Sequence, residues 1–163
     1  MGSILRLSDA VSLALHTSIF LAGRPSQLVS VGEMAQSLGV SEAHLSKVLQ
    51  RLAKVGLVRS VRGPRGGFAL TGPAKSVRLL DVYEAIEGPL MSADCLLGKP
   101  VCNGRGCILG GLVGTVGRQV RAYLSRTRLS ELTGVYGTEG NSEARAGHRR
   151  SNRSTRNGRS KPR

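Results

Sequence analysis

The sequence predicts a mainly α-helical fold with one small β-hairpin, and three observations lead to this prediction. Apolar residues recur at helical spacing over residues 31–38 and again over 42–55, with a short glycine-containing turn between the two stretches. Two short segments containing Val and Phe follow, joined by a glycine-rich stretch, which is typical of a hairpin. A further apolar stripe over residues 109–124 predicts a long C-terminal helix.

The length and charge of the chain limit what it can be. Its 163 residues suffice for one compact core with additional helices, which excludes a large multidomain enzyme. The formal charge of +14 favours a polyanionic partner such as DNA, RNA or an acidic membrane surface. Residues 138–163 hold eight basic and two acidic residues but no Val, Leu, Ile, Met, Phe or Tyr. We expect a basic disordered tail there, either an auxiliary DNA-contacting arm or a dispensable segment.

The first predicted helix covers residues 10–22, with Ser8 as its N-cap and Gly23 near its end. Asp9 and His16 interrupt its apolar residues and no basic cluster precedes it, which argues against a signal peptide. No segment reaches the roughly eighteen apolar residues that a membrane span requires. We therefore expect a cytoplasmic protein with no membrane partner.

The stretches at residues 31–38 and 41–55 are expected to form a helix-turn-helix, because each ends at a glycine and a tight turn separates them. The second helix divides into two faces at about 100 degrees per residue. Its apolar stripe consists of Leu45, Val48, Leu49, Leu52 and Val55. Its opposite face carries Ala43, Lys47, Gln50, Arg51 and Lys54. A solvated charged face is the plain alternative, but the neighbouring short helix and hairpin favour DNA recognition.

Residues 57–62 and 68–71 are the predicted strands, and the glycines of the loop between them permit a close approach to a phosphate backbone. A hairpin after a helix-turn-helix is a wing, whose basic tip suits the minor groove or its flanking phosphates; a hairpin that merely closes the domain is the alternative. Residues 1–76 would thus form a winged helix-turn-helix DNA-binding domain. The expected DNA-binding residues are Ser41, His44, Ser46, Lys47, Gln50, Arg51, Arg59, Arg62, Gly63, Arg65 and Gly66.

Residues 77–137 are expected to contain a linking helix over 77–87, a cysteine loop and a long C-terminal dimerisation helix from about residue 108. The apolar residues of the long helix follow heptad spacing: Leu109, Leu112, Val113, Val116, Val120, Tyr123 and Leu124. Its glycines, at 110, 111, 114 and 117, each cost roughly 0.8 to 1 kcal/mol relative to Ala, so packing must stabilise it. They would let a second backbone approach closely, which favours a homodimer; packing on its own domain is the alternative.

Cys95, Cys102 and Cys107 lie close together in a Gly/Pro-rich loop. Thiolates are the ligands that suit zinc and iron-sulfur clusters, and an odd number of cysteines fits poorly with a disulfide framework. Lys99 and Arg105 would help to keep these thiols ionised. A soft-metal site is therefore predicted beside a DNA-binding domain.

Several short motifs match one known family. They are the sequence Leu-Arg-Leu-Ser at 5–8, Gly-Leu-Val at 56–58, the wing at 61–68, the three-cysteine loop, and Leu-Ser-Glu-Leu at 129–132. On these the chain resembles the Rrf2 family of bacterial winged-helix regulators, the group containing IscR, NsrR and RirA, over approximately residues 4–135. The resemblance implies a homodimer that binds a palindromic operator and, in members with these cysteines, an iron-sulfur cluster. Cluster type stays open between 2Fe-2S and 4Fe-4S.

Three cysteines leave one cluster position that needs another ligand. Some family members use a histidine three residues after the third cysteine, where this chain has Gly110. Others reach across the dimer to an acidic residue on the first helix, at the position of Ser12, and one type uses a histidine at the position of His16. Asp9, Ser12 and His16 share one helical stripe. His16 is the leading candidate and Asp9 the next, with a packing role for His16 as the alternative.

Together these features predict a DNA-binding transcriptional regulator, acting as a repressor, that senses iron, redox or nitric oxide status through the cluster. A cluster-free regulator that uses the same thiols with zinc or a reversible disulfide is the first alternative. A thiol redox enzyme lacks support, since there is no Cys-x-x-Cys pair and no nucleotide-binding loop. An RNA-binding protein is also disfavoured, because two Phe, three Tyr and no Trp leave few platforms for base stacking. The expected partner is double-stranded DNA.

Overall fold

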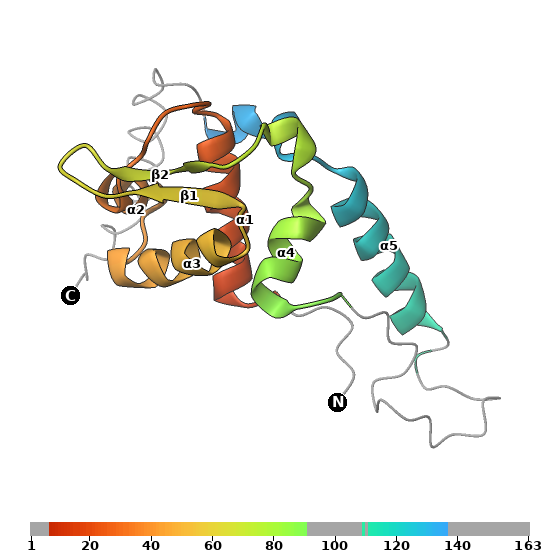
Figure 1. Cartoon of the computed structure of the whole chain (residues 1–163). Helices are drawn as coiled ribbons and strands as arrows, with labels where there is room; N and C mark the ends of the chain where they lie inside the picture. The colour runs from red at the N-terminus through yellow and green to blue at the C-terminus, as the bar shows by residue number, and fades with distance from the viewer. Residues whose placement is uncertain (1–6, 91–108, 110, 137–163) are drawn as a thin grey trace, which may run out of the picture.

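The computed structural model describes residues 7–90, 109 and 111–136. Its helices are α1 (Asp9–Ala22), α2 (Val31–Leu38), α3 (Glu42–Lys54), α4 (Leu79–Glu87) and α5 (Leu112–Arg126), and its strands are β1 (Val58–Val61) and β2 (Gly67–Leu70). Short 3-10 helices lie at η1 (Ala74–Ser76), η2 (Leu129–Glu131) and η3 (Thr133–Tyr136). Figure 1 shows α1 between the hairpin with α2 and α3 on one side and α4 with α5 on the other. The predicted mainly α fold with one β-hairpin is confirmed.

Serine caps set the beginnings of the first three helices, as the sequence indicated for two of them. The hydroxyl oxygens of Ser8, Ser30 and Ser41 accept N–H bonds from residues three positions further on, at 3.2, 3.2 and 3.4 Å. Each cap satisfies one N–H group that a helix leaves without an internal partner. α2 ends at Gly39, whose φ of 68° is left-handed, so a glycine closes the helix and turns the chain into α3.

The core forms where α1, α3 and α4 meet. Leu45, Val48, Leu49 and Leu52 of α3 are all at most 1% exposed, which confirms four members of the predicted apolar stripe. The fifth, Val55, is 54% exposed, and its assignment to the stripe was wrong. The helix ends at Lys54, so Val55 is the C-cap and no longer follows the helical rotation.

The hairpin is antiparallel, with Val58 opposite Leu70 and Val61 opposite Gly67. Val29, in the loop before α2, extends this ladder by two backbone hydrogen bonds with Phe68, at 3.0 and 2.8 Å. A Cβ at Gly67 would lie 2.5 Å from the Val29 carbonyl oxygen, so this close approach requires glycine. The β2 strand is thereby fixed to the body of the domain near the loop end of the hairpin.

The long C-terminal helix begins later than predicted, at Leu112 instead of about residue 108. Gly111 precedes it with a φ of 81°, and Leu109 lies in the turn before it. The predicted single stripe divides into two faces. Val113 and Leu124 are buried, whereas Leu112 and Tyr123 are 54% and 57% exposed.

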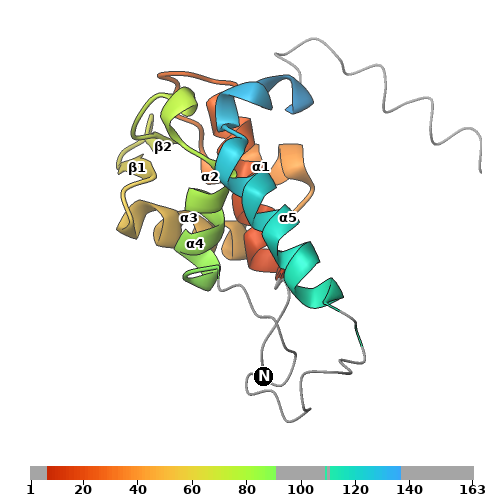
Figure 2. The ribbon, with the colours of Figure 1, turned by 90° about the vertical axis from the view of Figure 1, so that its right-hand side faces the viewer.

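α5 packs along α4, and the two helices share one hydrophobic core with α1 and α3. Figure 2 shows α5 running beside α4 and in front of α1. Within the described parts of the chain, none of the helices has the length and apolar character to cross a membrane.

Candidate nucleic-acid interface

The solvent-facing side of α3 is polar and basic. Ser46 is half-buried, and the exposed residues of this helix and its cap are Ser41, Glu42, Ala43, His44, Lys47, Gln50, Arg51 and Lys54. The buried stripe on the other side holds the helix against the domain, so its exposed side is presented on a fixed support. The hydroxyl of Ser41 is used in capping the helix, where it accepts the N–H of His44.

The wing carries three exposed arginines: Arg59 on β1, Arg62 just after it, and Arg65 in the loop. The two glycines predicted as phosphate contacts differ in their surroundings. Gly63 has a φ of +119° and open space around its Cβ position, so the conformation requires glycine and the surface there is unobstructed. At Gly66 a Cβ would overlap the carbonyl oxygen of Val61, and its N–H donates to the Gly63 carbonyl at 2.9 Å. Gly66 therefore closes the turn.

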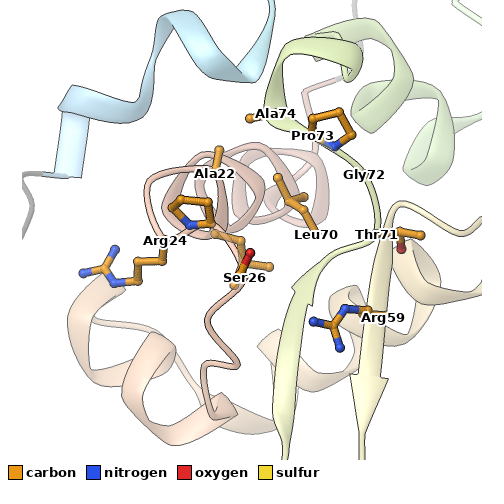
Figure 3. Close-up of a pocket in the computed structure, with 11 residues that line it drawn as sticks. Ala22, Arg24, Ser26, Arg59, Leu70, Thr71, Gly72, Pro73 and Ala74 are labelled. Carbon is orange, nitrogen blue, oxygen red and sulfur yellow. The ribbon is translucent and has the colours of Figure 1, made fainter.

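A pocket of about 400 Å³ lies between the end of α1 and the base of the wing. Figure 3 shows Arg24 and Arg59 on opposite sides of it, with Ser26 and Leu70 between them. The Arg24 guanidinium stacks 3.7 Å from the ring centroid of Phe20 and donates to the Phe20 carbonyl at 3.2 Å. Sequence reasoning missed Arg24; its position just after a helix end was the available signal. It adds positive charge behind the wing.

Arg51 lies on the basic side of α3, but its guanidinium is engaged within the chain. It donates a hydrogen bond to the backbone carbonyl of Ile86, near the end of α4. Nothing in the sequence of α3 reveals this bond, because its acceptor is 35 residues away. The Arg51 guanidinium thus has a hydrogen-bond partner within the domain, so a contact with DNA is not needed to explain its position.

Cys95, Cys102 and Cys107 lie outside the described residues, as do Gly110 and the basic tail. The described ranges contain no group of three or more His, Cys, Asp or Glu side chains that could hold a metal ion. Cluster binding by these three cysteines therefore stays a prediction.

The predicted fourth ligand, His16, is exposed on α1, as are Asp9 and Ser12. His16 Nδ1 forms a hydrogen bond with the Tyr136 hydroxyl of η3, and the Tyr136 ring also packs edge-on against Phe20, with centroids 5.8 Å apart. Burial raises the pKa of the Tyr136 hydroxyl. The bond uses Nδ1, so Nε2 is the His16 nitrogen that it leaves available.

A helix-turn-helix followed by a basic two-stranded wing defines a winged-helix DNA-binding protein of the transcriptional regulator class. The chain belongs to the Rrf2 family, whose model, described as "Iron-dependent Transcriptional regulator", matches residues 7–134. The resemblance drawn from the sequence motifs is therefore confirmed, and with it the assignment to a family of transcriptional regulators.

Two curated relatives are similar to part of this chain. Protein aau3 of Rhizobium meliloti is 36% identical over 91 residues, which cover 56% of this chain and 59% of the relative. The HTH-type transcriptional regulator BadM of Rhodopseudomonas palustris is 39% identical over 83 residues, covering 51% and 53%. The chain thus matches little more than half the length of these relatives.

Solved structures show the same fold over most of the chain. CymR of B. subtilis, the global cysteine regulator of that organism, has a TM-score of 0.68 and 26% identity, covering 80% of this chain and 98% of CymR. CymR of Staphylococcus aureus has a TM-score of 0.64 and 27% identity, covering 78% and 97%. IscR of T. potens has a TM-score of 0.61 at 21% identity, covering 78% and 85%, and this likeness concerns the fold alone.

Proposed function

We propose that this chain is a homodimeric repressor whose affinity for a palindromic operator depends on an iron-sulfur cluster held by Cys95, Cys102 and Cys107. The observation that carries the DNA-binding part is the basic side of α3 beside a wing with three exposed arginines. Residues 1–76 would bind DNA and residues 77–137 would sense and dimerise, as two functions of one shared core. The tail, 138–163, would add non-specific contacts through its positive charge.

Direct DNA contacts are assigned to the side chains of α3 and the wing that the domain leaves exposed. His44, Lys47 and Gln50 would enter the major groove, with Ser46 at the edge of the contact. Arg59, Arg62 and Arg65 would bind phosphates or the minor groove, and the open surface at Gly63 would admit a phosphate. Ser41, Arg51 and Gly66, which the sequence placed in the same set, would support this surface from within the domain.

The exposed apolar side of α5 supports the homodimer. Leu112, Val116 and Tyr123 lie within about 40 degrees of one another around the helix, and Leu7, 59% exposed, lines an apolar groove beside Tyr123. Exposed apolar surface of this kind marks an interaction site. Gly117 lies about 140 degrees from Leu112 around the helix, so the seam would be made by these side chains and not by close approach at Gly117.

The cluster proposal rests on donor chemistry. A cluster supplies a centre that changes charge and coordination when it is oxidised, loses iron or reacts with nitric oxide. Three thiolates would bind it, and His16 would complete the set from the first helix through Nε2, with Asp9 as the other candidate. A ligating histidine commonly uses its second nitrogen for an orienting hydrogen bond, which Tyr136 would provide here. Movement of the cysteine segment would then alter the separation of the two recognition helices, to which operator affinity is sensitive.

A second candidate function uses the same cysteines without a cluster. Two solved neighbours are CymR proteins, one of them described as a global cysteine regulator, and S. aureus CymR is also solved in an oxidised form. The oxidised form of this neighbour makes thiol chemistry the second candidate for this chain. Applied to this chain, a disulfide or a zinc ion at the cysteines would take the place of the cluster.

Anaerobic purification separates the two candidates. Iron and acid-labile sulfide in the protein, with absorbance between about 300 and 500 nm, are expected for a cluster, because zinc and disulfides are colourless there. Cys102→Ala should remove this absorbance without unfolding the winged domain. A colourless wild-type preparation that cannot be reconstituted with iron and sulfide would overturn the cluster and leave the thiol mechanism; a coloured Cys102→Ala variant would show that Cys102 is no ligand.

A further inference from the structure

The point where the chain leaves α4 is bonded to two other helices at once. α4 ends at Glu87, and the last carbonyl groups of a helix have no partner within it. One of these, the Ile86 carbonyl, accepts the guanidinium of Arg51 from α3. A cation at this end of a helix is also favoured by the helix dipole. The proposed recognition helix, α3, is thus hydrogen-bonded to the end of α4.

The next bonds hold the backbone of Leu90, which is buried. Its carbonyl accepts the guanidinium of Arg121 from α5, and its N–H donates to the Glu84 carboxylate at 3.1 Å. Both backbone polar groups of Leu90 are therefore fixed by side chains. Leu90 is followed in the sequence by the segment that contains the three cysteines, the first of them five residues later.

The last residue of α4, Glu87, is also bonded to the beginning of α1. The Ser8 hydroxyl, which caps α1, donates to the Glu87 carboxylate at 2.5 Å. The exit of α4 is therefore a junction of side-chain bonds from α1, α3 and α5. The bond from Arg51 comes from the recognition helix, α3.

We propose that Arg51 and Arg121 are positioning residues that couple the exit of α4, and hence the cysteine segment beyond it, to the recognition helix. The bond from Arg121 would resist a shift of Leu90. A shift that moves the end of α4 with it would displace the Ile86 carbonyl, and the bond from Arg51 would pass this displacement to α3. This inference rests on the proposed sensing function, and it gives Arg51 a role in the response of the regulator in place of a contact with phosphate.

The test uses the full-length chain and measures operator affinity over a range of salt concentrations in the two sensor states, cluster-loaded and stripped. Arg51→Met and Arg121→Met are expected to reduce the ratio of the two affinities at least fivefold. The salt dependence of binding should stay as in wild type, because no phosphate contact is lost. Arg62→Met, a control in the wing, should weaken both states and lower the salt slope by about one.

Arg118→Met is the matched control on α5, because Arg118 donates its hydrogen bond to Thr115 of its own helix and is exposed. It should leave the affinity ratio unchanged. An Arg51→Met variant that loses affinity equally in both states, with a lower salt slope, would show that Arg51 contacts phosphate. Unchanged ratios in both Arg51→Met and Arg121→Met would also overturn the coupling.

Amide hydrogen exchange tests the coupling independently of any sensor response. In Arg121→Met, faster exchange is expected at residues 86–90 and also in α3, with α1 as protected as in wild type, which excludes global unfolding. Exchange in α3 equal to wild type would overturn the relay. If the two sensor states of wild type bind DNA equally, the proposed function fails, and the exchange result still decides whether the junction links α5 to α3.

Discussion

The winged half of the molecule and helix α5 use their apolar residues differently. In α3, every apolar residue within the helix bounds except the small Ala43 and half-buried Ala53 is buried, so the stripe has a single destination, the domain's own core. In α5 the apolar arc is wider, and half of it stays exposed at Leu112 and Tyr123. The apolar face of α3 is therefore covered within one chain, whereas α5 keeps exposed apolar surface that the proposed homodimer would cover.

The same substitution in the two regions should separate them most strongly. Leu52→Ala, at a fully buried site in α3, is expected to lower the free energy of unfolding by about 2–5 kcal/mol. Leu112→Ala, at an exposed site in α5, should change monomer stability by less than about 0.5 kcal/mol but weaken self-association. Urea denaturation and sedimentation velocity measure the two effects. Similar losses of monomer stability for both variants would break the distinction.

DNA affinity should depend on the winged half. Lys47→Ala and Arg62→Ala are each expected to weaken operator binding by about 1–3 kcal/mol while leaving any cluster absorbance intact. Arg118→Ala, which removes an exposed arginine from α5, serves as the control and should bind as wild type does. Fluorescence anisotropy with a labelled operator measures the affinities. Wild-type affinity in both Lys47→Ala and Arg62→Ala would refute the assigned surface.

Gly117 tests which side of α5 forms the proposed subunit contact. A Cβ there would meet no other atom within 4 Å, so Gly117→Ala should stabilise the folded monomer by about 0.8–1 kcal/mol through helix propensity. Self-association should be unchanged, because Gly117 lies away from the proposed seam. A weaker dimer in sedimentation experiments would instead place this glycine at the subunit contact.

The last substitution concerns the contact of η3 with α1. Tyr136→Phe removes the hydroxyl bonded to His16 but keeps the ring against Phe20, so the free energy of unfolding should fall by about 0.5–1.5 kcal/mol.

The same variant also tests a pH effect. Because burial raises the pKa of folded Tyr136 above its ordinary value of 10.0, wild-type stability should be lost as pH rises beyond 10 and the unfolded phenol ionises first. Stability measured from pH 8 to 11 should show this part of the decline in wild type and not in Tyr136→Phe. Identical pH profiles would contradict the raised pKa.

The sequence was sufficient where local chemistry decides the structure. Ser8 and Ser41 cap their helices, and glycines end α2 and open the turn of the wing, all through bonds within a few residues. The start of α5 was missed, because spacing does not show the backbone conformation of a glycine. The start of α5 was placed four residues early because helical spacing extends to Leu109, although Gly111 takes a left-handed conformation there.

The candidate site shows the same limit. The basic side of α3 follows from periodicity alone, and all its predicted polar members except Ser46 are exposed. Periodicity could not show that Arg51 bonds to α4, or that Gly66 closes a turn, because both depend on atoms the helix or hairpin meets only after folding. The split of the α5 stripe into a buried and an exposed face could not be predicted either, since an apolar stripe does not reveal which surface covers it.

The proposed function requires that chemistry at the thiols of the cysteine segment control the affinity of the winged half for DNA. The most direct measurement is the affinity of the anaerobic, cluster-loaded protein for its selected operator, compared with the same preparation after the cluster is removed by chelation. The account predicts that the two affinities differ by roughly tenfold or more, about 1.4 kcal/mol. Equal affinities for the loaded and stripped protein would contradict it.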